Sequence, residues 1–237
     1  VGAFRFELSK LTVPAIRERM LASLVNVSAE MAAKIADGLG MKVPEAMPKA
    51  LVKSLPPEVL KSPALSLTAL PGDDGIRSRK VAILVADGVE GASIVAVQAA
   101  LTTAGAVACV IAPRLGPVQT ADGESLVATA TLENSPSVLF DALVLPDGND
   151  GVGLLAGYGQ TQEFVTNQYR HGKTILTLGA SQVLLDQAGI SLTLASGKPD
   201  PGILLAGVDM LGDGVAAFIV AAGKHRHPAR DTEPPQF

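Results

Sequence analysis

Side chains that could act as nucleophiles or general bases are scarce in this sequence. It holds one cysteine, Cys109, and three histidines, His171, His225 and His227. A cysteine or serine activated by a histidine would suit acyl transfer or hydrolysis, provided that the fold brings the two together. From Arg79 onward, apolar runs alternate with helical segments, which predicts a parallel sheet with ligands bound beyond the carboxyl ends of its strands. The turns that follow the expected strands are therefore the places to search.

The first such turn, 87–91, carries two carboxylates, Asp87 and Glu90. It matches neither the dinucleotide-binding fingerprint nor the phosphate-binding loop of nucleotide hydrolases, and its negative charges would repel a phosphate. The alternative is a tight glycine turn whose carboxylates lie near a helix N-terminus, where negative charge is favourable. We favour this structural role.

The second turn, 146–151, reads Pro-Asp-Gly-Asn-Asp-Gly. Such a turn could present backbone N–H groups to an oxyanion. An ordinary strand-to-helix turn, with Asn149 or Asp150 as the N-cap, explains the same residues. The structural interpretation is again the preferred one.

The third turn, Leu178-Gly179-Ala180-Ser181, stands where a strand passes sharply into a helix, which is the position of a nucleophile elbow. Its apex residue is Leu178, which has neither a hydroxyl nor a thiol. Ser181 is the nearest nucleophile, and the N-cap of the following helix is its more ordinary role. The sequence therefore predicts no catalytic residue at this turn.

The histidines and the cysteine do not supply the missing partners. His171 is expected at a helix C-terminus, away from the catalytic edge of the sheet, where a cation is ordinary electrostatics. His225 and His227 flank Arg226 in the tail without acidic or thiol neighbours, so we expect no metal there. Cys109 falls in the middle of an expected strand and is predicted to be a buried, inert thiol.

The elements that position these residues follow from hydrophobic periodicity. Two short amphipathic helices come first, with Pro14 in the first turn of one and Ser28 as the cap of the other. Strands are expected over 81–86, 106–112, 141–146, 174–178 and 202–206, a hairpin over 117–129, and helices over 14–25, 29–37, 92–104, 153–171, 181–188 and 208–223. The expected organisation is the end of a helical domain (1–40), a Pro-rich linker (41–78), an α/β domain (79–224) and an unstructured or docked tail (225–237).

Composition excludes several classes of function. The chain has 237 residues, a formal net charge of −4 and 3% aromatic residues, so we expect neither a nucleic-acid-binding face nor a base-stacking platform. No apolar run is long enough to span a membrane. A single cysteine excludes a disulfide framework and fits a reducing, cytoplasmic compartment. The start at Val1 rather than Met predicts a fragment or a processed product.

Several stretches resemble large-subunit haem catalases. VGAFRFELSK at 1–10 and TVPAIRER at 12–19 resemble the end of their helical region. SPALSL at 62–67 and IRSRKVAILVADG at 76–88 resemble the linker and first strand of their extra C-terminal domain. The resemblance implies a flavodoxin-like three-layer sandwich with a mostly parallel sheet, similar to the class I glutamine-amidotransferase and intracellular-protease superfamily.

The resemblance also implies that the catalytic positions of that superfamily are lost. Its catalytic members place a cysteine where Leu178 stands and a glutamate where Ser93 aligns; Glu90 lies nearby but one helical turn early. In catalases the haem-ligand tyrosine and the distal histidine and asparagine lie far upstream, so Tyr158 and Tyr169 are not that ligand. The resemblance thus assigns haem and peroxide decomposition to the parent subunit, and no cofactor and no catalysis to this chain alone.

Three functions remain open at this point. In the first, the chain is an accessory domain that stabilises the catalase assembly and acts as a chaperone-like holdase; its partners are then the catalase core, unfolding clients and further copies of the chain. Loss of the upstream domain would bare apolar side chains as a candidate surface: Ile16, Met20, Leu24, Met31 and Ile35. The alternatives are a residual hydrolase or glyoxalase-like enzyme using Ser181 and a small-ligand sensor at the switch point of the sheet.

Overall fold

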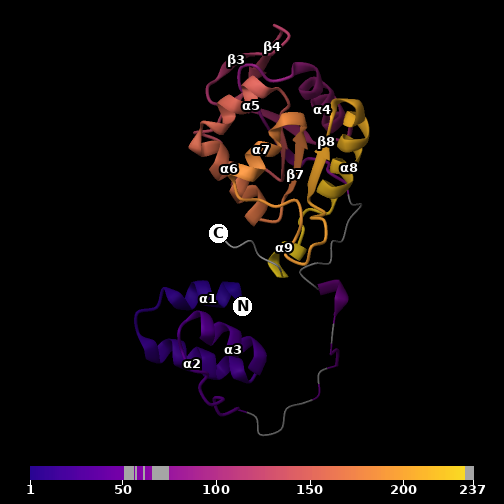
Figure 1. Ribbon diagram of the computed structural model, residues 1–237. Coiled ribbons are helices and arrows are strands. Elements are labelled where there is room, and N and C mark those ends of the chain that lie inside the picture. Colours follow the sequence, from indigo (N-terminus) through magenta and orange to yellow (C-terminus); the bar gives the residue numbers. More distant parts are fainter. Residues whose placement is uncertain (51–55, 57, 61, 66–74, 233–237) are drawn as a thin grey trace. The chain divides into compact units, whose positions relative to one another are not determined.

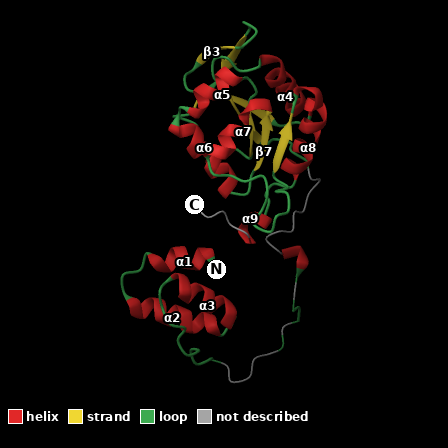
Figure 2. Cartoon of the chain, viewed as in Figure 1, coloured by secondary structure: helices red, strands yellow, loops and turns green. Residues whose placement is uncertain are grey.

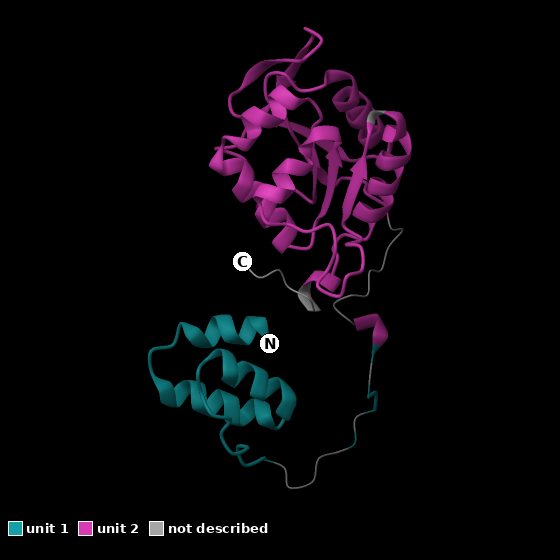
Figure 3. Ribbon diagram, in the orientation of Figure 1, with its two compact units in different colours: residues 1–62 teal, residues 63–237 magenta. Residues whose placement is uncertain are grey.

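The computed structural model describes residues 1–50, 56, 58–60, 62–65 and 75–232 (Figure 1). The chain divides into two compact units, residues 1–62 and residues 63–237 (Figure 3). Much of the expected Pro-rich linker, 51–55, 57, 61 and 66–74, lies outside the described residues, as does the end of the tail, 233–237.

The first unit is helical. It consists of α1 (Gly2–Ser9), α2 (Pro14–Val25) and α3 (Ala29–Gly38). The expected start signals are confirmed, because Pro14 begins α2 and the Ser28 hydroxyl accepts a hydrogen bond from the Met31 N–H at 3.2 Å. Helix α1 was not expected. The N–H of Met47 donates to the carbonyl of Ala22, so residues just after α3 attach to this unit.

The second unit is built on a parallel sheet. Its strands are β1 (Lys80–Leu84), β2 (Val107–Ala112), β5 (Ala130–Thr131), β6 (Ala142–Leu145), β7 (Thr174–Leu178) and β8 (Ile203–Ala206), in the order β5-β2-β1-β6-β7-β8. Every pairing in this sheet is parallel. Strands β3 (Gly116–Gln119) and β4 (Ser125–Ala128) form the expected antiparallel hairpin. The two-residue strand β5 was not expected.

Helices cover both faces of the sheet (Figures 1 and 2). Helices α4 (Gly91–Thr103) and α8 (Leu211–Gly223) pack on one face, and α5 (Asn149–Ala156), α6 (Gly159–Arg170) and α7 (Gln182–Gln187) on the other. Alternate residues of β1 supply the two cores: Val81 and Ile83 face α4, and Ala82 and Leu84 face α5 and α6. The expected three-layer sandwich is confirmed.

Two expectations about the helices need correction. The single helix predicted over 153–171 is two helices, α5 and α6, which are separated at Gly157 and Tyr158. Glycine is a poor residue for a helix interior, and here it sits at the C-cap of α5. In the tail, residues 229–232 form a short helix, α9 (Ala229–Thr232), and His227 and Arg230 are buried, so this part of the tail is docked.

Candidate functional site

The turns after β1, β6 and β7 lie at the same edge of the sheet, because their strands are parallel neighbours. In the first turn, Glu90 caps α4: its carboxylate accepts hydrogen bonds from the N–H groups of Ala92 at 3.0 Å and Ser93 at 2.8 Å. The expected role of Glu90 at a helix N-terminus is confirmed. Asp87 does something else, since it accepts from the N–H of Gln119 at 2.8 Å and contacts Arg114 at 3.3 Å. Asp87 thus attaches the β3–β4 hairpin to the turn after β1.

The crevice between the turns after β1 and β6 is closed by direct backbone contact. The N–H of Glu90 donates to the carbonyl of Asp147 at 2.9 Å. A Cβ on Gly148 would lie 2.6 Å from the carbonyl oxygen of Gly88, and one on Gly151 would lie 2.6 Å from the N–H nitrogen of Val89. Only glycine allows the two turns to come this close. The close contact leaves no space for a flavin or nucleotide between them, which argues against such a ligand.

The turn after β7 has the shape of a strand-to-helix turn but offers no nucleophile. Leu178 is buried with φ −100°, and the left-handed residue of the turn is Gly179, with φ +46°. Ser181 precedes α7, yet its side chain does not cap that helix. Its hydroxyl donates to the carbonyl of Leu178 at 2.8 Å and accepts from the N–H of the same residue at 3.1 Å. Ser181 occupies the N-cap position of α7, as expected, but without a side-chain cap bond. It is fully buried, so attack by its hydroxyl is disfavoured.

The carboxylate of Asp147 fills the space over this turn. One of its oxygens accepts hydrogen bonds from the N–H groups of Gly148 at 2.7 Å and Ala180 at 2.9 Å. A Cβ on Gly179 would coincide with the same carboxylate. Two amides that could serve an oxyanion are thus occupied by the protein's own side chain. This role of Asp147 was not predicted; the available signal was an acidic residue immediately before a glycine at a strand end.

The N-cap expected at the turn after β6 is also misplaced. Gly148, with φ +103°, occupies the N-cap of α5, and no side chain caps this helix. Asn149 and Asp150 are exposed residues of its first turn. A positive φ at the N-cap favours glycine. The helix therefore starts after Gly148, one residue earlier than the caps Asn149 or Asp150 would require.

None of the three histidines approaches the turn after β7. His171 lies at the C-cap of α6, as expected, and burial together with nearby cations lowers its pKa. His225 follows α8, and His227 contacts Thr174, the first residue of β7, at the opposite end of that strand. Cys109 is only partly buried, which corrects the expected full burial, and desolvation raises the pKa of its thiol. Neither a Ser-His-Asp nor a Cys-His arrangement is assembled.

A buried polar cluster fixes the tail at the amino end of β7 and β8. Arg230 forms an ion pair with Asp200 at 2.7 Å, and both side chains are almost fully buried. The Arg230 guanidinium also donates to the carbonyls of Tyr169 and Lys173 and lies over the ring of Tyr169. The N–H of His227 donates to the carbonyl of Gly172. We call these side chains the tail cluster: Asp200, His227, Arg230, Tyr169 and Thr174.

We expect the tail cluster to make the unit acid-sensitive. Burial, with Arg230 nearby, lowers the pKa of His227 to about 4. In the unfolded chain a histidine has a pKa of about 6.5, so between these two pKa values the unfolded chain binds more protons than the folded chain. The free energy of unfolding therefore falls as the pH drops from about 6.5 toward about 4. We expect His227 to account for a loss of about 2 kcal/mol between about pH 7.5 and about pH 5.

Urea denaturation followed by circular dichroism at both pH values measures this loss. His227→Gln removes the titrating group and should flatten the pH dependence by that amount. His225→Gln alters a more exposed neighbour, whose pKa burial also lowers, and should flatten it less. An unchanged slope in His227→Gln would refute the assignment.

The candidate surface on the helical unit is only partly as expected. Ile16 and Met20 are 45% and 41% exposed. Leu24 and Ile35 are buried in the core between α1, α2 and α3, and Met31 is partly buried against it, so these three do not form an open surface. Val13, 50% exposed and three residues before Ile16, extends the row instead. We call Val13, Ile16 and Met20 the α2 row.

These features define a class of protein: a flavodoxin-like α/β domain with Leu178 at the turn after its β7 strand, joined to a small helical unit. Residues 77–231 match the family described as the C-terminal domain found in long catalases, and the chain belongs to this family. Catalase HPII of Pseudomonas putida is 34% identical over 227 residues, which cover 95% of this chain and 30% of that protein. Catalase C of Rhizobium meliloti is 37% identical over 201 residues, covering 82% and 27%. The chain thus spans less than a third of the length of these relatives.

Neither tyrosine of this chain lies in a cavity large enough for haem, the group that the resemblance places in the parent subunit. Tyr158 lines a cavity of about 170 Å³, below the range of roughly 300–1,000 Å³ usual for ligand sites. Tyr169 is buried under Arg230. Within the described ranges, no three His, Cys, Asp or Glu side chains are grouped to hold a metal ion. Likewise, none of the described helices is long and apolar enough to cross a membrane.

Proposed function

We propose that this chain is a non-catalytic accessory part of a long catalase, whose remaining part holds the haem and decomposes hydrogen peroxide to water and oxygen. The observation that carries the proposal is the turn after β7, where Leu178 replaces a nucleophile and the Asp147 carboxylate occupies the neighbouring amides. With Ser181 buried and bonded twice to Leu178, a residual hydrolase has no reactive group at this position.

The proposed role is stabilisation of the assembled enzyme, with the helical unit as the contact to the catalase core. The α2 row supports this role, because three large apolar side chains at helical spacing are about half exposed. Against the core, these side chains would be covered. In the chain by itself, the same row is available to bind the exposed apolar segments of an unfolding client.

A light-scattering assay with a heat-labile client tests this role. We expect this chain to suppress aggregation at a near-equimolar ratio, and Ile16→Asp with Met20→Asp to remove most of the suppression, because charge on the row opposes apolar binding. Deletion of residues 1–40 should have the same effect while leaving the α/β unit folded.

Val95→Asp is the matched control, since Val95 is 55% exposed on α4 of the other unit. Equal protection by all variants would refute the α2 row as the binding surface. If the chain does not suppress client aggregation, the holdase role is refuted. The stabilising role is then tested in the full-length catalase. There, the double variant should lower the temperature at which catalase activity is lost.

A further inference from the structure

The lysines and arginines of the α/β unit gather at one end of its sheet. Between residues 77 and 232 a single cation, Arg114, lies beyond the carboxyl ends of the strands. Every other lysine and arginine in this range lies where the chain enters β1, β7 or β8, or in the tail that is docked beside these strands. Because the strands are parallel, these segments meet at the amino end of the sheet. We call this surface the basic edge.

Several cations of the basic edge are free for a partner. Lys173 and Arg230 are buried, and Arg79 and Arg226 donate to backbone carbonyls. Five others are exposed, and their side chains form no hydrogen bond or ion pair with the described residues: Arg77, Lys80, Arg170, Lys198 and Lys224. These five carry charge that the fold itself does not use.

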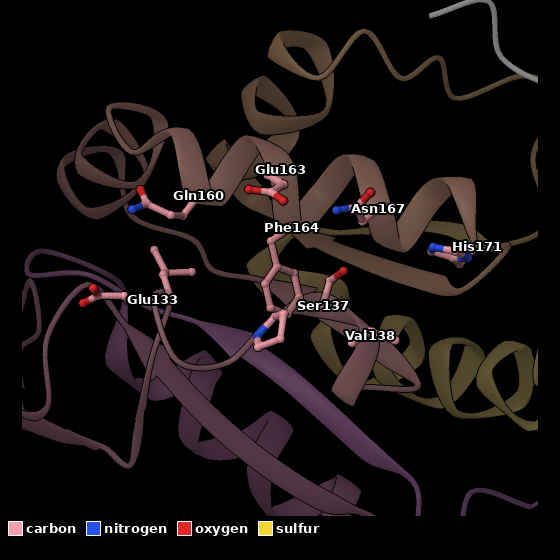
Figure 4. A pocket seen from close by; sticks show the side chains of 10 residues that line it. Glu133, Ser137, Val138, Gln160, Glu163, Phe164, Asn167 and His171 are labelled. Carbon is pink, nitrogen blue, oxygen red and sulfur yellow. The ribbon is translucent and has the colours of Figure 1, made fainter. Parts of the chain in front are cut away.

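The cations of the basic edge act on one another. Arg226 donates to the carbonyl of His171 at 2.6 Å, which joins the tail to the end of α6. Figure 4 shows His171 at this end of the helix. Desolvation, together with the positive charges of Lys173, Arg226 and Arg170, lowers the pKa of His171. The cations therefore form one positive surface rather than isolated charges.

The opposite end of the unit is acidic. Exposed carboxylates lie in the β3–β4 hairpin and just after β6 and β8, and none forms an ion pair within the described part of the chain: Asp122, Glu124, Asp150, Asp209 and Asp213. Arg114 does not offset them, because it is paired with Asp87. Figure 1 shows the hairpin at one end of the unit and α9 at the other. We call this second surface the acidic edge.

Helix dipoles explain part of this separation. Helices that flank a parallel sheet begin at its carboxyl end and finish at its amino end, so carboxylates are favoured at the first and cations at the second. Glu90 caps α4, and Arg79 donates to the carbonyls at the end of α8, in this way. The charges in the β3–β4 hairpin and in the segments before β1 and β8 stabilise no helix end. Dipoles therefore do not account for all of the separation.

We propose that the basic edge of one copy of this chain binds the acidic edge of a second copy. Charge complementarity carries the proposal, because the chain presents unpaired positive charge at one end of the α/β unit and unpaired negative charge at the other. Such a contact is head to tail. A bound pair therefore keeps one free edge of each kind, to which further copies can add. The contact does not use the α2 row, so it is independent of the proposed holdase role.

Sedimentation equilibrium of the whole chain at several protein and salt concentrations tests the proposal. At about 20 mM NaCl, where charges are felt over roughly 20 Å, the average mass should rise with protein concentration without stopping at a fixed oligomer. At about 1 M NaCl, where this distance is about 3 Å, the chain should be monomeric.

Three results would overturn the proposal. One is a monomer at both salt concentrations. Another is association that persists at about 1 M NaCl, because salt does not screen an apolar contact such as one made by the α2 row. The third is a chain that stays monomeric at low salt but binds polyglutamate at the basic edge. In that case the basic edge recognises a different acidic protein.

Neutralising variants assign the two edges. Arg170→Gln with Lys224→Gln should weaken the association about three- to tenfold, and so should Glu124→Gln with Asp150→Asn. The matched control is a double variant in the helical unit, which removes two exposed lysines: Lys42→Gln with Lys49→Gln. Its association should stay close to that of the native chain. Equal association of all three double variants would refute the two edges as the contact.

A mixture of the two edge variants tests the direction of the contact. One variant keeps the acidic edge intact and the other keeps the basic edge intact. The equimolar mixture should therefore form 1:1 pairs more tightly than either variant associates alone. No gain on mixing would contradict a head-to-tail contact, and circular dichroism of each variant shows whether its fold is kept.

Discussion

Replacement of Arg230 by alanine is expected to lower the free energy of unfolding of the α/β unit by about 3–5 kcal/mol. The side chain of Arg230 is 2% exposed, and that of its partner Asp200 is fully buried. Without the guanidinium, Asp200 would keep a buried charge with no counter-ion, which is far more costly than the loss of a surface pair. The carbonyls of Tyr169 and Lys173 would lose donors as well.

Thermal and urea denaturation of the whole chain, followed by circular dichroism, measures this loss. For a unit of this size, we expect a fall in Tm of roughly 6–15 °C. Arg226→Ala is the matched control: it lies in the same tail, but its guanidinium donates to the carbonyl of His171 in an exposed position. The loss in Arg226→Ala should stay below about 1 kcal/mol.

A variant without either charge separates charge burial from simple packing. Arg230→Met with Asp200→Asn should cost less than the sum of the two single changes, because no unpaired charge remains. Strict additivity, or a loss in Arg230→Ala no larger than in Arg226→Ala, would contradict the proposed importance of the ion pair.

The second large effect is expected at Gly179. Gly179→Ala should destabilise the unit by about 2–5 kcal/mol, because a left-handed backbone disfavours any side chain and the new Cβ meets the Asp147 carboxylate. The backbone φ of +46° and the overlap with Asp147 act together. Urea denaturation measures the change, with Gly153→Ala as the control. Gly153 lies in α5, its Cβ would have open space, and alanine there should be neutral or stabilising.

A double-mutant cycle distinguishes the two causes at Gly179. Asp147→Ala alone should cost about 1–2 kcal/mol, since the N–H groups of Gly148 and Ala180 lose their acceptor. In the Asp147→Ala background, Gly179→Ala should cost less than in the native chain, because only the backbone term remains. Equal costs in both backgrounds would show that Asp147 does not occupy the space over the turn.

This cycle also bears on the turn as a candidate site. Its apex residue is Leu178, which has no hydroxyl or thiol, and the Asp147 carboxylate occupies the N–H groups of Gly148 and Ala180 beside it.

The sequence was sufficient for five of the six strands of the sheet and for the position of Leu178 at the turn after β7. Strands β1 and β7 are buried on both faces, so their sequences are continuous apolar runs that identify them without tertiary information. The position of Leu178 at the turn after β7 was predictable because this residue ends such an apolar run. Helix caps such as Glu90 and Ser28 were also predictable, because a cap bonds to N–H groups only two or three residues ahead.

The tertiary structure decided what depends on partners distant in sequence. Arg230 and Asp200 are 30 residues apart, His227 and Thr174 are 53 apart, and Asp147 and Ala180 are 33 apart. The burial of Leu24 and Ile35 likewise depends on how three helices pack. Local periodicity and propensity carry no information on such pairings, because these contacts form only when separate elements meet in the folded unit.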